Sequence, residues 1–174
     1  GIALRYFNPI GADPQLRSGL PLKEPSLVVG RMVMVAQGLL PEFLITGTDY
    51  PTRDGTGVRD YIHVWDLAQA HVAAVLDFDG AFARAGNPPD NYLVINLGSG
   101  NGVTVRELVN AFENVLGREI PKQDMPARPG DVAGAYANND KARTLLGWQP
   151  EMSVEQCIAD AITWGEKRKE VLGY

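Results

Sequence analysis

The stretch from Asp54 to Asp66 reads Asp-Gly-Thr-Gly-Val-Arg-Asp-Tyr-Ile-His-Val-Trp-Asp, and it guides the interpretation of the whole chain. Its two glycines favour turn conformations with φ > 0 and let the backbone come close to a ligand. They precede Arg59, which stands before a short apolar strand predicted over Tyr61 to Val64. Because a guanidinium stays charged and can bond phosphate oxygens in pairs, Arg59 suits an anionic ligand. A surface ion pair between Arg59 and Asp60 is the alternative.

The composition is that of an ordinary globular protein of one domain, or of one domain and a part of another. The 174 residues are 45% hydrophobic and 21% charged, and the formal net charge of −5 argues against a nucleic-acid surface. A single cysteine, Cys157, lies among apolar residues at helical spacing, which indicates a core residue. Neither an apolar run of transmembrane length nor a signal peptide is visible, so no membrane partner and a cytoplasmic location are expected. Because the chain begins with Gly-Ile, we expect it to lie within a longer protein.

Two short apolar runs predict buried strands. The first, Ile2 to Phe7, is stopped at Pro9, since proline cannot donate a hydrogen bond to a neighbouring strand. The second covers Tyr92 to Leu97. Ligands of open α/β sheets bind beyond the carboxyl ends of strands, which is where Asn8 stands. A turn-forming asparagine before proline is the alternative explanation for Asn8.

Polar residues before apolar periodic segments predict two helix starts in the first half of the chain. Ser26 is expected to cap a helix from Leu27 to Gln37, and the free amides of such an N-terminus attract phosphate. Asp66, with Gln69 three residues later, is expected to cap a helix that reaches about Phe78.

The segment Gly98-Ser99-Gly100-Asn101-Gly102 follows the second strand but does not predict a dinucleotide site. Val103 stands where the G-x-G-x-x-G fingerprint requires its third glycine. The segment instead predicts a turn into a helix that begins with a Thr104/Glu107 capping box and ends at Gly117.

The last third of the chain predicts two more helices, from Asp140 to a stop at Gly147 and from a Ser153/Gln156 cap to about Lys169. The histidines lack partners at metal-ligand spacing, so no metal site is expected.

Three motifs in the same order carry a resemblance to a known family: Arg5-Tyr6-Phe7-Asn8-Pro9, Asp54 to Val64, and Arg128-Pro129-Gly130-Asp131. Together they resemble the C-terminal half of the UDP-glucose 4-epimerases, within the extended short-chain dehydrogenase/reductase family. The resemblance implies an α/β fold: a substrate-binding α/β domain plus the last strands of a Rossmann sheet, with the N-terminal cofactor half missing. Residues 1–9 and about 60–100 would pack with the NAD-binding domain, and about 10–59 and 101–174 would bind the UDP-sugar.

The resemblance also implies roles for single residues. Tyr6 and Phe7 would lie beside the nicotinamide of NAD, and Asn8 would bind the nucleotide-sugar. Arg59 and Arg128 would hold the diphosphate, and Asp131 would accept hydrogen bonds from the ribose; without the resemblance, an Arg128–Asp131 ion pair is equally open. Ser26 and Leu27 would also contact the substrate, at the place where the family has Asn-Leu. Leu44, Ile45 and Thr46 would border the uracil, and Ala135 would lie beside the C2 substituent of the sugar.

The implied reaction inverts C4 of a UDP-hexose by hydride transfer to NAD and back, with a tyrosinate as base. This chain has no glycine-rich βαβ start and no Tyr-x-x-x-Lys motif, so we expect it to hold no catalytic residue and to be inactive alone. The full-length protein is expected to be a homodimer. Two alternatives stay open: another NAD-dependent nucleotide-sugar epimerase, dehydratase or decarboxylase of the same family, and a non-catalytic nucleotide-sugar-binding module.

Overall fold

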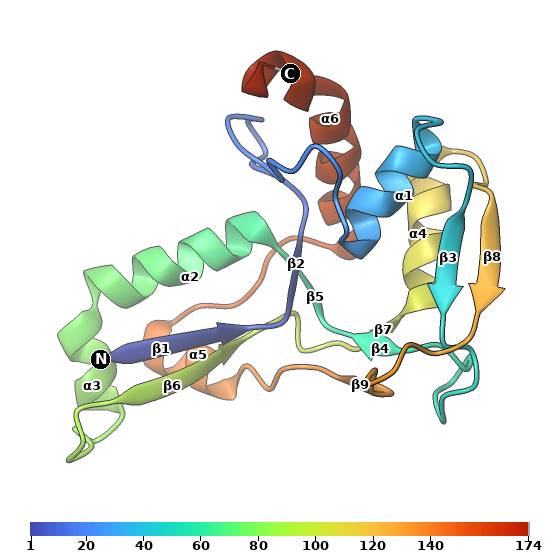
Figure 1. Ribbon diagram of the computed structural model, residues 1–174. Coiled ribbons are helices and arrows are strands. Elements are labelled where there is room, and N and C mark those ends of the chain that lie inside the picture. Colours follow the sequence, from blue (N-terminus) through green and yellow to red (C-terminus); the bar gives the residue numbers. More distant parts are fainter. Residues whose placement is uncertain (174) are drawn as a thin grey trace.

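The computed structural model describes residues 1–173, which form an elongated α/β arrangement of short strands and helices (Figure 1). The strands are β1 (Ile2–Tyr6), β2 (Asn8–Ile10), β3 (Phe43–Thr46), β4 (Val58–Arg59), β5 (Tyr61–His63), β6 (Leu93–Leu97), β7 (Val103–Thr104), β8 (Lys122–Met125) and β9 (Gly134–Ala135). The helices are α1 (Val28–Ala36), α2 (Val64–Leu76), α3 (Phe78–Arg84), α4 (Val105–Leu116), α5 (Asp140–Leu146) and α6 (Val154–Leu172). No helix within the described range is both long enough and apolar enough to cross a membrane.

The strands join in small, mostly parallel sheets, which confirms the predicted α/β class. β1 runs parallel to β6, β2 to β5 and β3 to β8. The fourth sheet has the order β7-β4-β9, and we call it the β4 sheet. The sequence did not predict β8 or β9, because neither strand has an apolar alternation of its own. Their pairing partners, not their composition, make them strands.

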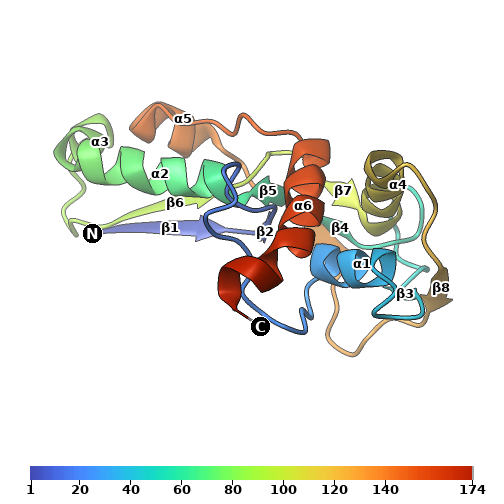
Figure 2. The same cartoon turned by 90° about the horizontal axis from the view of Figure 1, so that it is seen from above.

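Two hydrophobic cores lie on either side of β5. Tyr61 belongs to the core formed with α1, α4 and α6, whereas Ile62 belongs to the core formed with α2, α3, α5 and β6. Successive residues of a strand point to opposite faces, so β5 separates and joins the two cores. Seen from above, α2, α3 and α5 cover one face of the β1–β6 pair, and no described element covers the other face (Figure 2).

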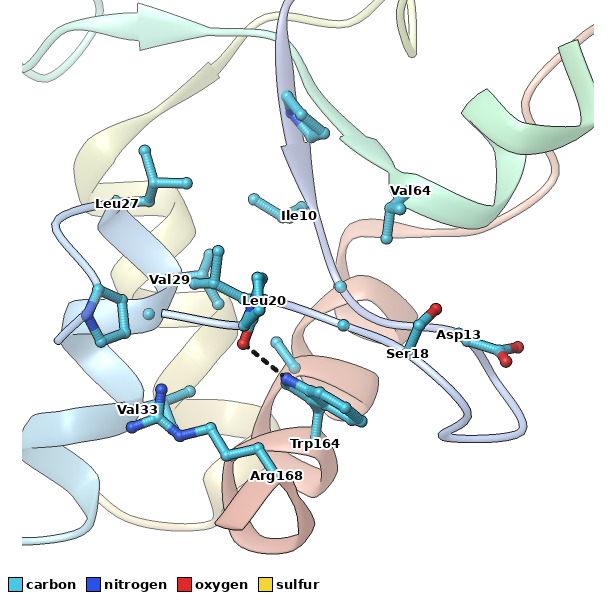
Figure 3. A pocket seen from close by; sticks show the side chains of 18 residues that line it. Ile10, Asp13, Ser18, Leu20, Leu27, Val29, Val33, Val64, Trp164 and Arg168 are labelled. Atoms are coloured by element: carbon cyan, nitrogen blue, oxygen red, sulfur yellow. Dashed lines mark hydrogen bonds between the residues drawn. The ribbon is translucent and has the colours of Figure 1, made fainter. Parts of the chain in front are cut away.

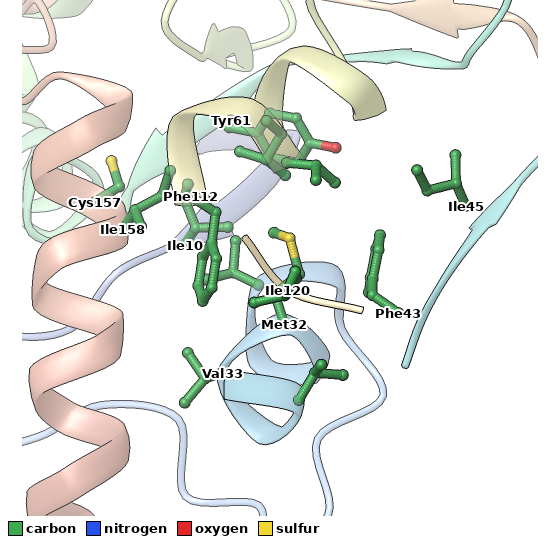
Figure 4. Packing of buried hydrophobic residues seen from close by; sticks show 14 residues of the cluster. Ile10, Met32, Val33, Phe43, Ile45, Tyr61, Phe112, Ile120, Cys157 and Ile158 are labelled. Carbon is green, nitrogen blue, oxygen red and sulfur yellow. The ribbon is translucent and has the colours of Figure 1, made fainter. Parts of the chain in front are cut away.

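The first core is built around Phe112 of α4, Met32 of α1 and Ile158 of α6, all fully buried (Figure 4). Cys157 packs in this core, which confirms its predicted place. Burial raises the pKa of its thiol to about 12, so it stays protonated at neutral pH and cannot serve as a nucleophile.

The predicted Ser26 cap is wrong. α1 begins one residue later than expected, with Leu27 in the N-cap position and no side chain capping it. Ser26 is exposed, and the first helical turn is closed by the main chain, where the Arg31 N–H donates to the Leu27 carbonyl at 2.9 Å. The predicted helix stop is confirmed by Gly38, which has φ 72° directly after the cap residue Gln37.

The predicted Asp66 cap is also wrong. α2 begins at Val64, and His63 caps it by accepting a hydrogen bond at Nδ1 from the Trp65 N–H at 2.9 Å. Asp66 is buried inside the first turn, where its carboxylate accepts from the Glu151 and Met152 N–H groups at 3.2 and 3.0 Å. A carboxylate that bonds a distant segment is not available to cap its own helix.

The predicted capping box of α4 is confirmed. Thr104 Oγ1 accepts from the Glu107 N–H at 3.1 Å, and the Glu107 carboxylate accepts from the Thr104 N–H at 2.9 Å. The helix ends, as predicted, at Gly117 with φ 76°. The Thr104 hydroxyl also donates to Asp54, so the cap ties α4 to the glycine-containing loop that precedes Arg59.

We expect Thr104→Ala to lower the free energy of unfolding by about 1–2 kcal/mol, because it removes the cap and one donor to Asp54. Urea unfolding of the variant and the wild type measures the difference. The matched control is Ser153→Ala at the start of α6, where the serine hydroxyl accepts from the Gln156 N–H at 3.2 Å. A loss for Thr104→Ala no larger than that for Ser153→Ala would contradict the double role of Thr104.

Candidate functional site

The β4 sheet brings together Arg59 and Ala135, which the family resemblance assigns to one ligand. Arg59 of β4 lies in parallel register with Ala135 of β9 and in antiparallel register with Val103 of β7. The contact between β4 and β9 is close: a Cβ placed on Gly134 would lie 2.5 Å from the Val58 carbonyl oxygen. Only glycine permits this approach, so the backbone of β9 carries Ala135 directly beside Arg59.

Arg59 is half-buried and oriented by main-chain carbonyls. Its Nη1 donates to the Val58 carbonyl at 2.8 Å, and its Nη2 donates to the Val132 carbonyl at 3.2 Å. Among residues 1–173, no carboxylate pairs with this guanidinium. A cation held in place by neutral acceptors keeps its charge available for an anion.

The alternative of a surface pair between Arg59 and Asp60 is wrong. Asp60 has no exposed surface, and its carboxylate accepts hydrogen bonds from backbone N–H groups of Ser99, Gly100 and Ala137. The sequence held no local signal for this role, since the donors lie far along the chain.

Arg128 and Asp131 lie in one turn that leads into β9. Arg128 Nε donates to Asp131 Oδ2 at 3.0 Å, and the Asp131 N–H donates to the Arg128 carbonyl at 3.1 Å. The arginine side chain is 70% exposed and the carboxylate 25%. The local ion pair is therefore present, but an exposed pair of this kind contributes little to stability and can open when a ligand competes for it.

The three uracil candidates of β3 do not face the same way. Phe43 and Ile45 are buried in the first core (Figure 4), whereas Leu44 is 38% exposed and Thr46 half-buried on the opposite face. The side chains of Leu44 and Thr46 can therefore cover a ligand. Ile45 can offer only its main chain.

The residues at the end of β1 stand at the centre of the molecule. Tyr6 is 50% exposed, and its ring lies edge-on to that of His71 with 6.0 Å between centroids. Phe7 and Asn8 are half-buried, and the Asn8 N–H donates to the Asp60 carbonyl at 3.0 Å. Both views place the β4 sheet between this junction and the β3–β8 pair (Figures 1 and 2).

A cavity of about 300 Å³ lies apart from the β4 sheet, between β2, α1, α6 and the loop that joins β2 to α1 (Figure 3). Its walls are mostly apolar, and Leu27 is the one expected site residue that lines it. The loop is held against α6 by Trp164, whose Nε1 donates to the Leu20 carbonyl at 2.9 Å, and by Arg168, whose Nη1 donates to the Leu22 carbonyl at 2.6 Å. These bonds fix the loop that brings Ser26 and Leu27 to α1.

Two buried side chains that could act as a base, Tyr61 and His63, are not available for that role. Burial raises the pKa of Tyr61 to about 12, so this phenol is protonated at neutral pH. The fully buried His63 uses both ring nitrogens, one toward Trp65 and the other toward Asp160 Oδ2 at 3.0 Å. Within residues 1–173, no group of three potential ligands could hold a metal ion.

Comparison with known proteins places this site in a family. The family model described as GDP-mannose 4,6 dehydratase matches residues 21–161. A UDP-glucose 4-epimerase of Bacillus subtilis is 45% identical over 175 residues, which cover 98% of this chain and 48% of that protein.

Two solved structures are similar throughout the chain. The UDP-glucose 4-epimerase of Stenotrophomonas maltophila, with bound NAD and formylated UDP-arabinopyranose, has a TM-score of 0.86 and 40% identity, covering 97% of this chain and 48% of that one. The enzyme from Bifidobacterium longum, in complex with NAD⁺ and UDP, has a TM-score of 0.84 and 40% identity, covering 99% of this chain and 49% of that one.

The chain spans about half the length of these relatives and corresponds to their C-terminal half. The match to the family model covers most of the chain. This chain therefore belongs to the GDP-mannose 4,6 dehydratase family, in which it is similar to the UDP-glucose 4-epimerases.

Proposed function

We propose that this chain supplies the UDP-sugar site of an NAD-dependent UDP-glucose 4-epimerase that interconverts UDP-glucose and UDP-galactose. The observation that carries the proposal is Arg59: a half-buried guanidinium, held by two main-chain carbonyls, without a carboxylate partner among the described residues. Arg59 lies in register with Ala135 of β9. The turn of Arg128 and Asp131 precedes Ala135 in the same segment. The similarity to epimerases with bound UDP compounds supports the choice of ligand.

In this proposal the two arginines hold the diphosphate from different segments. Arg59 offsets one anionic charge from the β4 sheet, and Arg128 offsets the other after it releases Asp131 to the ribose hydroxyls. Leu44, Ile45 and Thr46 border the uracil. Ser26 and Leu27 approach the ligand with their main chain, just before α1. Asn8 and Ala135 border the sugar. The chain thus binds and orients the substrate.

The end of β1 fits a nicotinamide cofactor. Tyr6 and Phe7 present aromatic surface at the carboxyl end of a parallel strand, where flat ligands of α/β sheets bind. NAD, bound mainly by the other half of the protein, would accept hydride from C4 and return it to the opposite face. Tyr6 and Phe7 would limit the position of the ring and exclude water from that side.

We also propose that the lobe of β1, β6, α2 and α3 packs against the cofactor domain. β1 pairs only with β6 in the described part of the chain, so its other edge is open to a further strand. Exposed apolar side chains gather on the adjoining helices: Val72, Val75, Leu76 and Phe78. The division at about residues 9, 60 and 100 stays a prediction. We also propose that the whole protein is a cytoplasmic homodimer, as the motif resemblance implies.

In the whole protein, Arg59→Ala and Arg128→Ala should each weaken UDP binding by about 1.5–3 kcal/mol, the range for a charge-assisted hydrogen bond. We expect Arg59 to lie at the upper end, because it is more buried and more rigidly held. Isothermal titration calorimetry with UDP measures both effects.

The matched control is Arg118→Ala, which removes another arginine that donates to a main-chain carbonyl, that of Ala36. Its affinity for UDP should equal that of the wild type. Unchanged affinity in both Arg59→Ala and Arg128→Ala would return these residues to a structural role. GDP, titrated in parallel, tests the second candidate, a GDP-sugar enzyme, which the family match itself favours.

A further inference from the structure

Asp60 joins three separate segments through one buried carboxylate. Its Oδ1 accepts from the Ser99 N–H at 2.6 Å and from the Ser99 hydroxyl at 2.7 Å. Its Oδ2 accepts from the Gly100 N–H at 3.2 Å and from the Ala137 N–H at 2.9 Å. The Asp60 side chain has no exposed surface, whereas Ser99 and Gly100 on the donor side are partly buried. Hydrogen bonds to a carboxylate shielded in this way are stronger than in water.

The loop after β6 is shaped to fit this carboxylate. A Cβ placed on Gly98 would overlap Asp60 Oδ2 and would lie 2.6 Å from the Ala137 Cβ. Gly98 is further held by Asn139, whose Oδ1 accepts from the Gly98 N–H at 3.1 Å and whose Nδ2 donates to the Gly98 carbonyl at 2.6 Å. The glycine-rich segment that resembles a dinucleotide loop is thus a set of donors for Asp60.

The segments that Asp60 joins carry the proposed sugar and diphosphate contacts. The Asp60 carbonyl accepts from the Asn8 N–H at 3.0 Å, and Arg59 is its neighbour in the chain. Ala137 follows β9, two residues beyond Ala135. One residue therefore sets the positions of Asn8, Arg59 and Ala135 relative to one another.

We infer that Asp60 is the positioning residue of the UDP-sugar site: it holds β9 and the loop after β6 against β4, and so sets the ligand-binding geometry of Arg59 and Ala135. This inference rests on the proposed function. It assigns to Asp60 no contact with the ligand; Asp60 acts through the segments that its carboxylate ties together.

Asparagine cannot reproduce this arrangement. All four bonds come from donors, and a carboxylate has two oxygens to accept them, whereas an amide has one oxygen and one NH₂. If the amide NH₂ of Asp60→Asn takes the Oδ2 position, it points at two backbone donors, those of Gly100 and Ala137. If it takes the Oδ1 position, it points at the Ser99 N–H, and only the Ser99 hydroxyl can turn to accept from it. The segment on that side must move away, because donors that face each other without an acceptor are strongly unfavourable.

Calorimetry with UDP on the whole protein separates positioning from folding. The binding stoichiometry reports the folded fraction, and Kd reports the geometry of the folded site. We expect Asp60→Asn to raise Kd about tenfold or more, because a displaced Arg59 loses a charge-assisted bond to the ligand. Ser99→Ala, which removes only the hydroxyl bond, should raise Kd by a smaller factor.

The matched control is Asp66→Asn, which alters a second buried carboxylate that accepts backbone N–H groups, those of Glu151 and Met152. In Asp66→Asn the UDP-binding stoichiometry should fall with the stability of the variant. Its Kd for UDP should stay within about twofold of the wild type, since a substitution distant from the binding site acts independently of it. A wild-type Kd in Asp60→Asn, with reduced stoichiometry, overturns the inference. If Asp60→Asn does not fold, a wild-type Kd in Ser99→Ala overturns it. A wild-type protein that does not bind UDP contradicts the proposed function instead.

Discussion

Residues 1–174 alone are expected to show no interconversion of UDP-glucose and UDP-galactose, even when NAD is added. The proposed site binds and orients a UDP-sugar, but epimerisation also needs a base at the C4 hydroxyl and a hydride acceptor beside C4. Positioning by itself cannot break the C–H bond. We therefore expect the rate to fall from that of an enzyme to that of the uncatalysed reaction.

Three buried side chains that could act as a base or nucleophile are protonated or already hydrogen-bonded. The Tyr61 phenol and the Cys157 thiol each have a pKa of about 12 because of burial. His63 is fully buried with both nitrogens bonded. None of the six tyrosines is followed by lysine at the fourth position, which excludes a Tyr-x-x-x-Lys base in this chain.

A coupled assay that detects UDP-glucose formed from UDP-galactose tests this expectation. The whole protein is assayed in parallel at the same molar concentration, and circular dichroism establishes that the isolated chain is folded. Turnover by a folded, purified chain would show that the chemistry does not depend on the other half.

Ala135→Tyr in the whole protein is expected to lower kcat/KM for the epimerisation of UDP-N-acetylglucosamine while sparing that of UDP-galactose. Ala135 is exposed and lies in register with Arg59, so its side chain borders the proposed sugar site. A methyl group there leaves room for an N-acetyl substituent at C2. A phenol ring would fill that space, and overpacking costs about 1–3 kcal/mol, or about a 5- to 150-fold loss in kcat/KM for the larger substrate.

The neighbouring Tyr136 does not close the same space. Its ring lies over Gly102, where an added Cβ would come within 2.9 Å of Tyr136 Cδ1. Tyr136 lies directly after β9, and this contact keeps its ring beside Gly102.

The test measures kcat/KM for both substrates in the wild type, in Ala135→Tyr and in the control Ala135→Ser. Serine is nearly as small as alanine, so this variant should keep both activities. Two results would refute the assignment: a wild type without N-acetyl activity, or equal losses on the two substrates in Ala135→Tyr.

Signals that act within a few residues predicted much of the secondary structure. The Thr104/Glu107 capping box, the glycine stops at Gly117 and Gly147, and the Ser153 cap all lie where the pattern put them. The two wrong caps, Ser26 and Asp66, are residue types that favour the N-cap position, yet neither caps its helix. For Asp66 the reason is tertiary, because its carboxylate is bonded to a distant segment.

The sequence by itself determined the α/β class, the strands β1 and β6, the helix boundaries with local caps, and the family, because these depend on neighbouring residues or on motifs in linear order. Only the tertiary structure decided that Arg59 pairs with Ala135, that Ile45 faces the core, and that Asp60 is a buried acceptor for donors about 40 and 77 positions away. Strand register and buried hydrogen bonds join segments distant in the chain. Their energies depend on which groups meet once water is excluded, and no local pattern encodes that meeting.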